Sequence, residues 1–151
     1  MVIMNNLPAI VLLAAGAGSR FEGPGHKLTQ KVRLGGDDAT ILGACLANAN
    51  ATGLRVVVVT TQELAALVGE QVAVRDVVVV PPAAPERGRG MGDSIAAGVL
   101  ACGDAAGWLI LPGDMPCVQP DTMLTIAQAM QGHSVVYAQY RSRRGHPVGF
   151  A

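Results

Sequence analysis

One stretch near the start decides the fold of this chain: Ile10-Val11-Leu12-Leu13-Ala14-Ala15-Gly16-Ala17-Gly18-Ser19-Arg20. Its first half is apolar and suits a buried strand, and its second half consists mainly of small residues and glycines. Glycine lets the main chain approach an anion closely and turn its N–H groups toward it. Arg20 and the later Lys27 supply the guanidinium and ammonium donors that bind phosphate. The stretch therefore predicts a strand that runs into a phosphate-binding loop.

Apolar runs and helical patterns alternate along the rest of the chain. The predicted strands cover residues 9–13, 55–60, 76–80, 107–111 and 134–140, and the predicted helices cover 38–52, 62–69, 93–103 and 120–130. The all-valine runs at 56–59 and 77–80 show no polar alternation, which is typical of parallel strands covered on both faces. This order predicts a three-layer α/β/α sandwich with a mainly parallel, Rossmann-like sheet, formed by a single domain over residues 1–151.

Local signals predict where the helices begin and end. Asp38 is the expected cap of the first helix, and Gly53 is its expected left-handed end. Asp93 or Ser94 is the expected cap of the third helix. Pro120 suits the first turn of the fourth helix, where a missing N–H costs nothing.

The composition narrows the possible function classes. The 11 basic and 11 acidic residues give a formal net charge of zero, which argues against an electrostatic nucleic-acid binder. No apolar run is long enough for a membrane span, and no signal peptide is visible. Cys45, Cys102 and Cys117 match neither a zinc pattern nor a disulfide framework, and the first two lie among apolar positions typical of a core. We therefore expect a cytoplasmic protein that binds neither nucleic acid nor membranes.

Polar residues follow the predicted strands, as expected where ligands bind beyond the carboxyl ends of a parallel sheet. They occupy positions 16–20, 60–62, 81–89 and 113–114. Asp114 is the strongest candidate among them, because a carboxylate at this edge can hold a Mg²⁺ ion that also binds substrate phosphates. The alternative is an ordinary turn aspartate after Gly113.

The opening loop fits neither of two common nucleotide-binding motifs. A dinucleotide fingerprint needs a third glycine where Phe21 stands, and the glycine spacing before Lys27 is wrong for a Walker A loop. A phosphate-binding loop of a third type is favoured, and a turn without a ligand is the alternative.

Two further segments have the composition of ligand-binding loops. Residues 88–94 are glycine-rich and run into a predicted helix start, whose free N–H groups suit an anion or a ribose. Residues 140–150 resemble a hairpin that carries Arg141, Arg143 and Arg144, and they suit a second, anionic substrate. The alternative for the first segment is a plain surface loop, with Arg87 and Arg89 solvated. The alternative for the second segment is an exposed basic turn.

Other catalytic arrangements are missing from the sequence. No Ser/His/Asp order and no metal-binding Cys/His cluster is present, and His26 and His133 have no evident partner and are interpreted as surface residues. The remaining features favour phosphoryl chemistry, which needs cations and Mg²⁺ more than a protein nucleophile.

Several motifs together resemble the MobA-like nucleotidyltransferases, and most of all their molybdenum cofactor cytidylyltransferase branch. In chain order they are Leu13-Ala-Ala-Gly-Ala-Gly-Ser-Arg20, Gly90-Met-Gly-Asp-Ser94, Leu111-Pro-Gly-Asp-Met-Pro116 and Arg144-Gly-His-Pro-Val-Gly-Phe150. The resemblance implies transfer of CMP from CTP to molybdopterin cofactor, with Mg²⁺ as cofactor and pyrophosphate as the second product. It also implies a molybdenum hydroxylase apoenzyme as the recipient of the product.

The same resemblance implies the roles of individual residues. Arg20, Lys27 and Asp114 would be catalytic, with Asp114 as the Mg²⁺ ligand, and Arg144, Gly145 and His146 would face the pterin. Ala15 favours cytosine, because guanylyltransferase relatives carry glycine at its position. The residues expected to bind the nucleotide are Leu13, Ala14, Ala15, Gly16, Ala17, Gly18, Ser19, Thr60, Gly90, Gly92 and Ser94.

The chain departs from the family pattern in two ways. Six residues separate Arg20 from Lys27, which is a longer spacer than the family usually has. Family members also continue beyond the position of Ala151, so we expect this chain to lack a C-terminal part of the domain. The alternative functions are a guanylyltransferase, a sugar-phosphate or polyol-phosphate nucleotidyltransferase, and a non-catalytic module for cofactor delivery.

Overall fold

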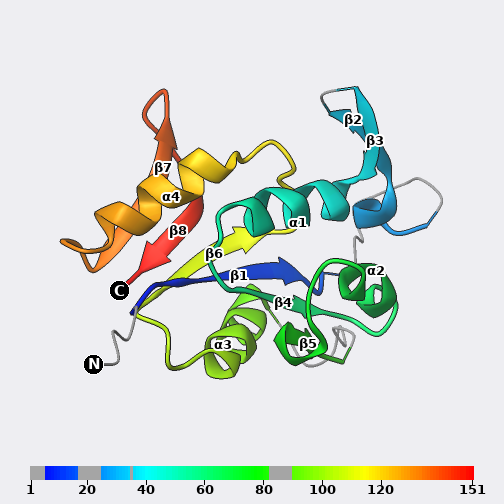
Figure 1. The fold of residues 1–151 in the computed structure, drawn as a ribbon, viewed down its shortest axis with the longest axis horizontal. Coiled ribbons are helices and arrows are strands. Elements are labelled where there is room, and N and C mark those ends of the chain that lie inside the picture. The colour runs from blue at the N-terminus through cyan, green and yellow to red at the C-terminus, as the bar shows by residue number, and fades with distance from the viewer. Residues whose placement is uncertain (1–5, 17–24, 35, 82–89) are drawn as a thin grey trace.

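The computed structural model describes residues 6–16, 25–34, 36–81 and 90–151, and a six-stranded sheet lies at its centre (Figure 1). The strand order is β5-β4-β1-β6-β8-β7. These strands are β1 (Ala9–Ala14), β4 (Val56–Thr60), β5 (Val77–Val79), β6 (Trp108–Pro112), β7 (Val135–Tyr140) and β8 (Arg143–Phe150). The helices are α1 (Ile41–Ala51), α2 (Ala65–Gly69), α3 (Met91–Ala101) and α4 (Pro120–Ala129), with short 3₁₀ helices η1 (Lys27–Thr29) and η2 (Val74–Asp76).

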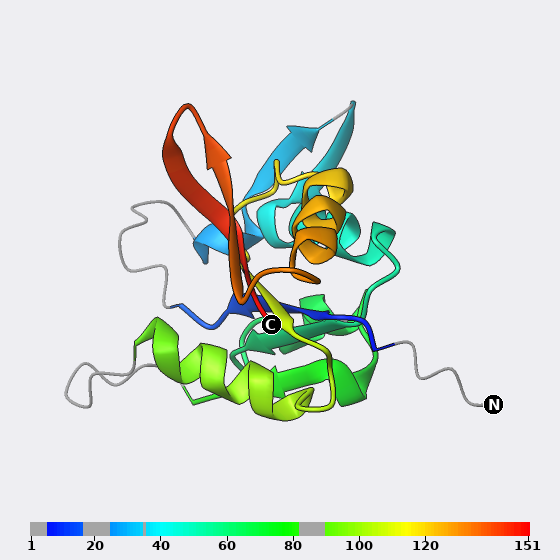
Figure 2. The same ribbon diagram turned by 90° about the vertical axis from the view of Figure 1, so that its left-hand side faces the viewer.

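Helices cover the sheet on both faces, with α1 and α4 on one side and α3 on the other (Figures 1 and 2). Side chains of β1 alternate between the two layers: Ile10 and Leu12 pack in the α1 layer, whereas Ala9 and Val11 pack in the α3 layer. The predicted three-layer sandwich is therefore confirmed. No helix in the described ranges is long and apolar enough to cross a membrane.

The sheet is mainly parallel, as predicted. β1 pairs in parallel with β4 and β6, and β4 pairs in parallel with β5, whereas β8 runs antiparallel to β6 and β7. The predicted hairpin at residues 140–150 is confirmed as the β7–β8 turn. Arg141 and Ser142 have φ values of 48° and 64°, the positive values that a two-residue type I′ turn requires.

Three predicted helix starts are wrong. Thr40 rather than Asp38 caps α1, because its Oγ1 accepts a hydrogen bond of 2.9 Å from the N–H of Gly43. Gly90 rather than Asp93 or Ser94 caps α3, and Asp93 in the first turn accepts a hydrogen bond of 3.1 Å from the N–H of Gly90. The helix predicted over 62–69 begins at residue 65, after a turn.

The two other predicted signals at helix ends are confirmed. Gly53 follows the end of α1 with a φ of 76°, the left-handed conformation that glycine adopts at low cost. Pro120 is the first residue of α4, where its missing N–H has no helical partner to lose.

A small hairpin outside the main sheet is absent from the sequence-based prediction. β2 (Lys31–Leu34) pairs antiparallel with β3 (Asp37–Thr40), and the two strands project from the domain beside α1 (Figure 1). Asp38 lies in β3 opposite Arg33, with the Arg33 Nε and Asp38 Oδ1 atoms 3.5 Å apart. Because most of β2 is exposed, these strands lack the apolar run that identifies the buried strands.

Gly98 provides a test of the contact between α3 and the sheet. A Cβ atom at this position would overlap Val11 Cγ1 and lie 3.0 Å from Val59 Cγ2. We expect Gly98→Ala to lower the free energy of unfolding by about 1–3 kcal/mol, because both neighbours belong to the packed sheet. Urea unfolding followed by circular dichroism measures this loss.

Gly92→Ala is the matched control for that substitution. Gly92→Ala makes the same change in the same helix, where an added Cβ would meet none of the described residues within 4 Å. Because glycine lowers helix stability, this variant should be unchanged or up to about 1 kcal/mol more stable. Equal stabilities of the two variants would contradict the described packing of α3.

Candidate active site

The parallel strands end side by side at one edge of the sheet. Ala14 at the end of β1 lies opposite Thr60 at the end of β4. The ladder continues one residue past β6, where the N–H of Gly113 donates to the carbonyl of Leu13 at 2.8 Å. The N–H of Val80 donates to the carbonyl of Thr60, also at 2.8 Å. The polar segments that follow these strands therefore emerge at a common edge, as the sequence predicts.

Lys27 and Asp114 meet at this edge. Lys27 Nζ lies 3.0 Å from Asp114 Oδ2, and the two side chains are 44% and 42% exposed. An ion pair this exposed contributes little to folding stability, because water screens it and both side chains lose conformational freedom. Its interest is chemical, since a cation and a carboxylate lie together where a ligand can reach both.

The segment that carries Asp114 is held in place by α1. Cys45 Sγ contacts the carbonyl oxygen of Gly113 at 3.1 Å, and Asn48 Nδ2 donates to the carbonyl of Pro116 at 2.9 Å. Gly113 itself approaches β1 so closely that a Cβ there would lie 2.9 Å from the Leu13 carbonyl oxygen. These contacts on both sides of Asp114 fix the backbone from which its carboxylate projects.

Burial raises the pKa of the Cys45 thiol from 9.0 to about 12, so this thiol stays protonated as the donor to Gly113. Cys45 and Cys102 are buried, which confirms their prediction as core residues, and Cys117 is exposed. At neutral pH, we expect a thiol reagent to label Cys117 in the native protein and all three cysteines after unfolding. Mass spectrometry of the labelled protein checks this, and native labelling of Cys45 as fast as that of Cys117 would contradict it.

The raised pKa of the Cys45 thiol also predicts that the free energy of unfolding falls at high pH. The unfolded chain loses the Cys45 proton near the ordinary pKa of 9.0, before the folded protein does. The folded state then binds more protons than the unfolded state, so this contribution to stability is present below pH 9 and is lost as the pH rises toward 12. Urea unfolding at increasing pH gives the free energy of unfolding of the wild type and of Cys45→Ala. If this free energy changed with pH equally in the two proteins, the predicted contribution of Cys45 would be contradicted.

His26 is a site residue that sequence reasoning missed. Its ring contacts the Gly16 carbonyl oxygen at 2.9 Å through Nε2 and accepts from the Leu28 N–H at 3.1 Å through Nδ1. The interpretation of His26 as a residue without a partner is therefore wrong. The available signal was its position directly before a short helical turn, where a side-chain acceptor caps free N–H groups. His133 is exposed as predicted, but it too has a partner, because its Nδ1 lies 3.1 Å from the Ala129 carbonyl oxygen.

The described part of the opening loop lies at the same edge. Ala14 is buried, Leu13 and Ala15 are partly buried, and Gly16 is exposed. Thr60 is 0% exposed, and its hydroxyl donates to the Ala14 carbonyl at 3.1 Å. Its side chain therefore holds the end of β1 and does not itself reach the surface. The predicted site residues outside the described ranges are Ala17, Gly18, Ser19 and Arg20, together with Arg87 and Arg89 of the second glycine-rich segment.

The start of α3 reaches the same edge of the sheet by topology. The chain leaves β5 at its carboxyl end, and α3 returns it to the amino end of β6, so Gly90, Gly92 and Ser94 lie at the carboxyl side. Gly90 and Gly92 are exposed, with no described residue within 4 Å of an added Cβ, and Ser94 is partly buried. The described residues therefore leave this helix start uncovered.

The β7–β8 hairpin extends beyond β6 at this edge. Because β8 is antiparallel to β6 with Val148 opposite Ile110, the earlier residues Arg144, Gly145 and His146 lie toward the carboxyl end of β6. The Arg144 guanidinium stacks over the Tyr137 ring at 4.5 Å, which holds an exposed cation in a fixed orientation.

The donors at this edge decide which metal the site suits. Among the described residues, no group of three or more His, Cys, Asp or Glu side chains is arranged to hold a metal ion. Asp114 offers a single exposed carboxylate, and Mg²⁺ is commonly bound by few carboxylates together with substrate phosphates and water. A single carboxylate fits a hard divalent cation held jointly with a substrate, and the described residues around it do not form a structural zinc site.

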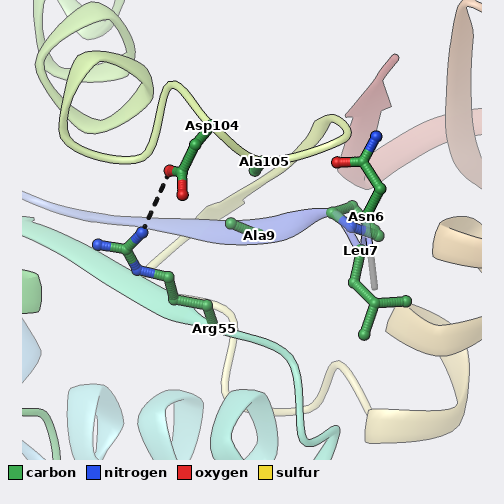
Figure 3. Close-up of a pocket in the computed structure, with 7 residues that line it drawn as sticks. Asn6, Leu7, Ala9, Arg55, Asp104 and Ala105 are labelled. Atoms are coloured by element: carbon green, nitrogen blue, oxygen red, sulfur yellow. Dashed lines mark hydrogen bonds and ion pairs between the residues drawn. The ribbon is translucent and has the colours of Figure 1, made fainter. Parts of the chain in front are cut away.

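A pocket of about 260 Å³ lies at the opposite edge, at the amino ends of the strands (Figure 3). Arg55 lines it, but the guanidinium already contacts Asp76 at 2.9 Å and Asp104 at 3.5 Å. The hydrogen bond to Asp76 raises the pKa of Arg55 further. Because two carboxylates already neutralise its charge, Arg55 is better suited to stabilising the fold than to binding an anionic ligand.

Comparisons with known proteins give a family match and solved structures with the same fold. The model of the MobA-like NTP transferase domain family matches residues 10–151. No curated protein matches the chain.

Solved structures with the same fold include Rv0371c from Mycobacterium tuberculosis H37Rv, at 26% identity and a TM-score of 0.75, over 97% of this chain and 72% of that one. Rv0371C in complex with manganese matches at 25% identity and a TM-score of 0.68, over 97% and 71%. A nucleotidyl transferase from Methanothermobacter thermautotroptrophicus (Mth528) matches at 27% identity and a TM-score of 0.65, over 95% and 71%.

Proposed function

The chain belongs to the MobA-like NTP transferase domain family, and from this membership we propose that it transfers CMP from CTP to molybdopterin cofactor and releases pyrophosphate. One observation carries the proposal: the Lys27 ammonium and the Asp114 carboxylate lie 3.0 Å apart at the carboxyl edge of the sheet. These groups provide the phosphate-binding cation and the metal-binding carboxylate that nucleotidyl transfer needs.

In the proposed complex the triphosphate lies between the opening loop and Lys27. Backbone N–H groups at the end of β1 and the start of α3 would face phosphate and ribose oxygens, and Lys27 and Arg20 would neutralise the phosphate charge. Mg²⁺, when bound, would supply further charge neutralisation, with Asp114 as its protein ligand. The crystallised manganese complex of the structurally similar Rv0371C supports a divalent cation in the proposed complex.

The proposed reaction needs no nucleophile from the protein. A terminal phosphate oxygen of the molybdopterin attacks the α-phosphorus of CTP, and a new P–O bond forms there. The bond from the α-phosphorus to the bridging oxygen breaks, and pyrophosphate leaves with the electron pair. The chain's contribution is to align the two phosphates and to stabilise the charge that develops between them.

The acceptor would bind on the side of the β7–β8 hairpin. Arg144, Gly145 and His146 lie toward the carboxyl end of β6, and the stacked Arg144 guanidinium suits an anionic, planar acceptor. Ala15, partly buried after β1, is the residue that favours cytosine over guanine in this proposal. A molybdenum hydroxylase apoenzyme is the proposed recipient of the product.

A panel of nucleotides tests the proposal. Pyrophosphate release is measured with CTP, GTP, UTP or ATP and Mg²⁺, each with and without molybdopterin cofactor. We expect release with CTP only when the pterin is present. Release with CTP that does not depend on the pterin would overturn the acceptor, and a preference for GTP would overturn the assigned base. Nucleotide binding without release under any condition would favour a cofactor-delivery module.

A further inference from the structure

His26 lies between the two parts of the proposed nucleotide site. On one side, its Nε2 is 2.9 Å from the carbonyl oxygen of Gly16, two residues beyond β1. On the other side, its Nδ1 accepts a hydrogen bond of 3.1 Å from the N–H of Leu28, within the turn that carries Lys27. One imidazole ring thus connects the opening loop to the Lys27 turn.

The two hydrogen bonds require one tautomer of the ring. Nδ1 accepts from a backbone N–H, so it carries no proton, and the proton of the neutral ring is on Nε2. Nε2–H can then donate to the Gly16 carbonyl, which only accepts. The contacts therefore match a neutral imidazole with its proton on Nε2.

Hydrogen bonds and core packing hold the Lys27 turn around this ring. The His26 carbonyl accepts from the backbone N–H and the hydroxyl of Thr29, at 3.0 and 2.7 Å. Leu28 is 6% exposed and packs in the core against the α1 layer. Because the turn is anchored in the core, the contact from Nε2 fixes the position of Gly16 relative to Lys27.

We propose that His26 is a positioning residue that holds Gly16 in place relative to the Lys27 turn and so preorganises Gly16 and Lys27 for the phosphates of a nucleotide. This inference rests on the proposed nucleotide site. Without this hydrogen bond, the backbone at Gly16 would lose conformational entropy when the ligand binds. The hydrogen bond from His26 orders Gly16 beforehand, so less entropy is lost on binding. Loss of this hydrogen bond is therefore expected to weaken nucleotide binding more than it slows the chemical step.

His26→Asn separates the hydrogen bond to Gly16 from the helix cap. Asparagine is a good capping residue whose oxygen can still accept from the Leu28 N–H. Its side chain is too short to reach the Gly16 carbonyl at the same time. We expect a Kd for CTP and Mg²⁺ that is about tenfold higher than in the wild type, with unchanged thermal stability, because one positioning hydrogen bond is lost. Kinetically, KM for CTP should rise and kcat should change little.

His133→Asn is the matched control, since His133 is exposed at the end of α4, and it should leave the Kd unchanged. Calorimetry with CTP and Mg²⁺ measures the Kd, and ¹⁵N NMR of the imidazole nitrogens identifies the His26 tautomer. A proton on Nδ1, or equal Kd values for wild type and His26→Asn, would overturn the positioning role. Failure of CMP transfer by a wild type that binds CTP would overturn the proposed function alone, and a wild type that binds no nucleotide would overturn both.

Discussion

Asp114→Asn is expected to slow pyrophosphate release by about 100-fold or more, because the variant lacks the carboxylate charge needed to hold a divalent cation against the phosphates. The substitution keeps the size of the side chain and its hydrogen-bonding capacity, so the loop between Gly113 and Pro116 should keep its contacts with α1. Initial rates at saturating CTP and Mg²⁺ measure the effect. Unchanged thermal stability would exclude unfolding as its cause.

Asp104→Asn is the control for this prediction. It makes the same chemical change in an exposed carboxylate at the opposite edge of the sheet, beside Arg55. Its ion pair is exposed and long, so the substitution should alter neither rate nor stability appreciably. If Asp114→Asn and Asp104→Asn had equal rates, the carboxylate at the end of β6 would have no part in the reaction.

Lys27→Met is expected to have opposite effects on catalysis and on metal binding. The value of kcat/KM for CTP should fall by about 100-fold, because an ammonium group no longer neutralises the triphosphate. Without nucleotide, however, the ammonium lies 3.0 Å from Asp114 and repels any cation at that carboxylate. Its removal should therefore strengthen Mn²⁺ binding by about threefold, the effect of an exposed charge pair. Electron paramagnetic resonance of free Mn²⁺ measures the affinity.

Lys31→Met controls for a general loss of positive charge. Lys31 is exposed on β2, four residues after Lys27, and no ion pair of Lys31 with a described acidic residue is found. Lys31→Met should change neither the kcat/KM for CTP nor the Mn²⁺ affinity appreciably. A Lys27→Met variant with weaker Mn²⁺ binding would contradict the described contact, because the ammonium would then be helping the carboxylate to hold the metal.

The parts of the fold that the sequence predicts are those whose own residue types reveal their burial. Val57, Val58 and Val59 are completely buried, and a strand covered on both faces consists mainly of apolar residues. The β2–β3 hairpin lacks this signal, because its strands pair with each other outside the main sheet. Asp38 has the residue type of a helix cap, but its backbone is in a strand and Thr40 provides the capping oxygen.

Some features of the site could likewise be predicted from the sequence, and others could not. Asp114 and the opening loop could be placed at one edge of the sheet, because parallel strands bring their carboxyl ends together. The contact between Lys27 and Asp114 could not, since 87 positions separate them and the turn that carries Lys27 is set by tertiary packing. The contacts of Cys45 and His26 with backbone carbonyls are equally hidden, because they depend on where two distant segments meet.

The fate of the α-phosphate of CTP tests the central claim most directly. Purified protein is incubated with Mg²⁺, molybdopterin cofactor and CTP that carries a radioactive label on either the α- or the γ-phosphate. We predict that the α-label moves to a pterin dinucleotide and the γ-label to pyrophosphate. Transfer of the γ-label to the acceptor, or an α-label that stays in CTP or in free CMP, would contradict nucleotidyl transfer to the pterin.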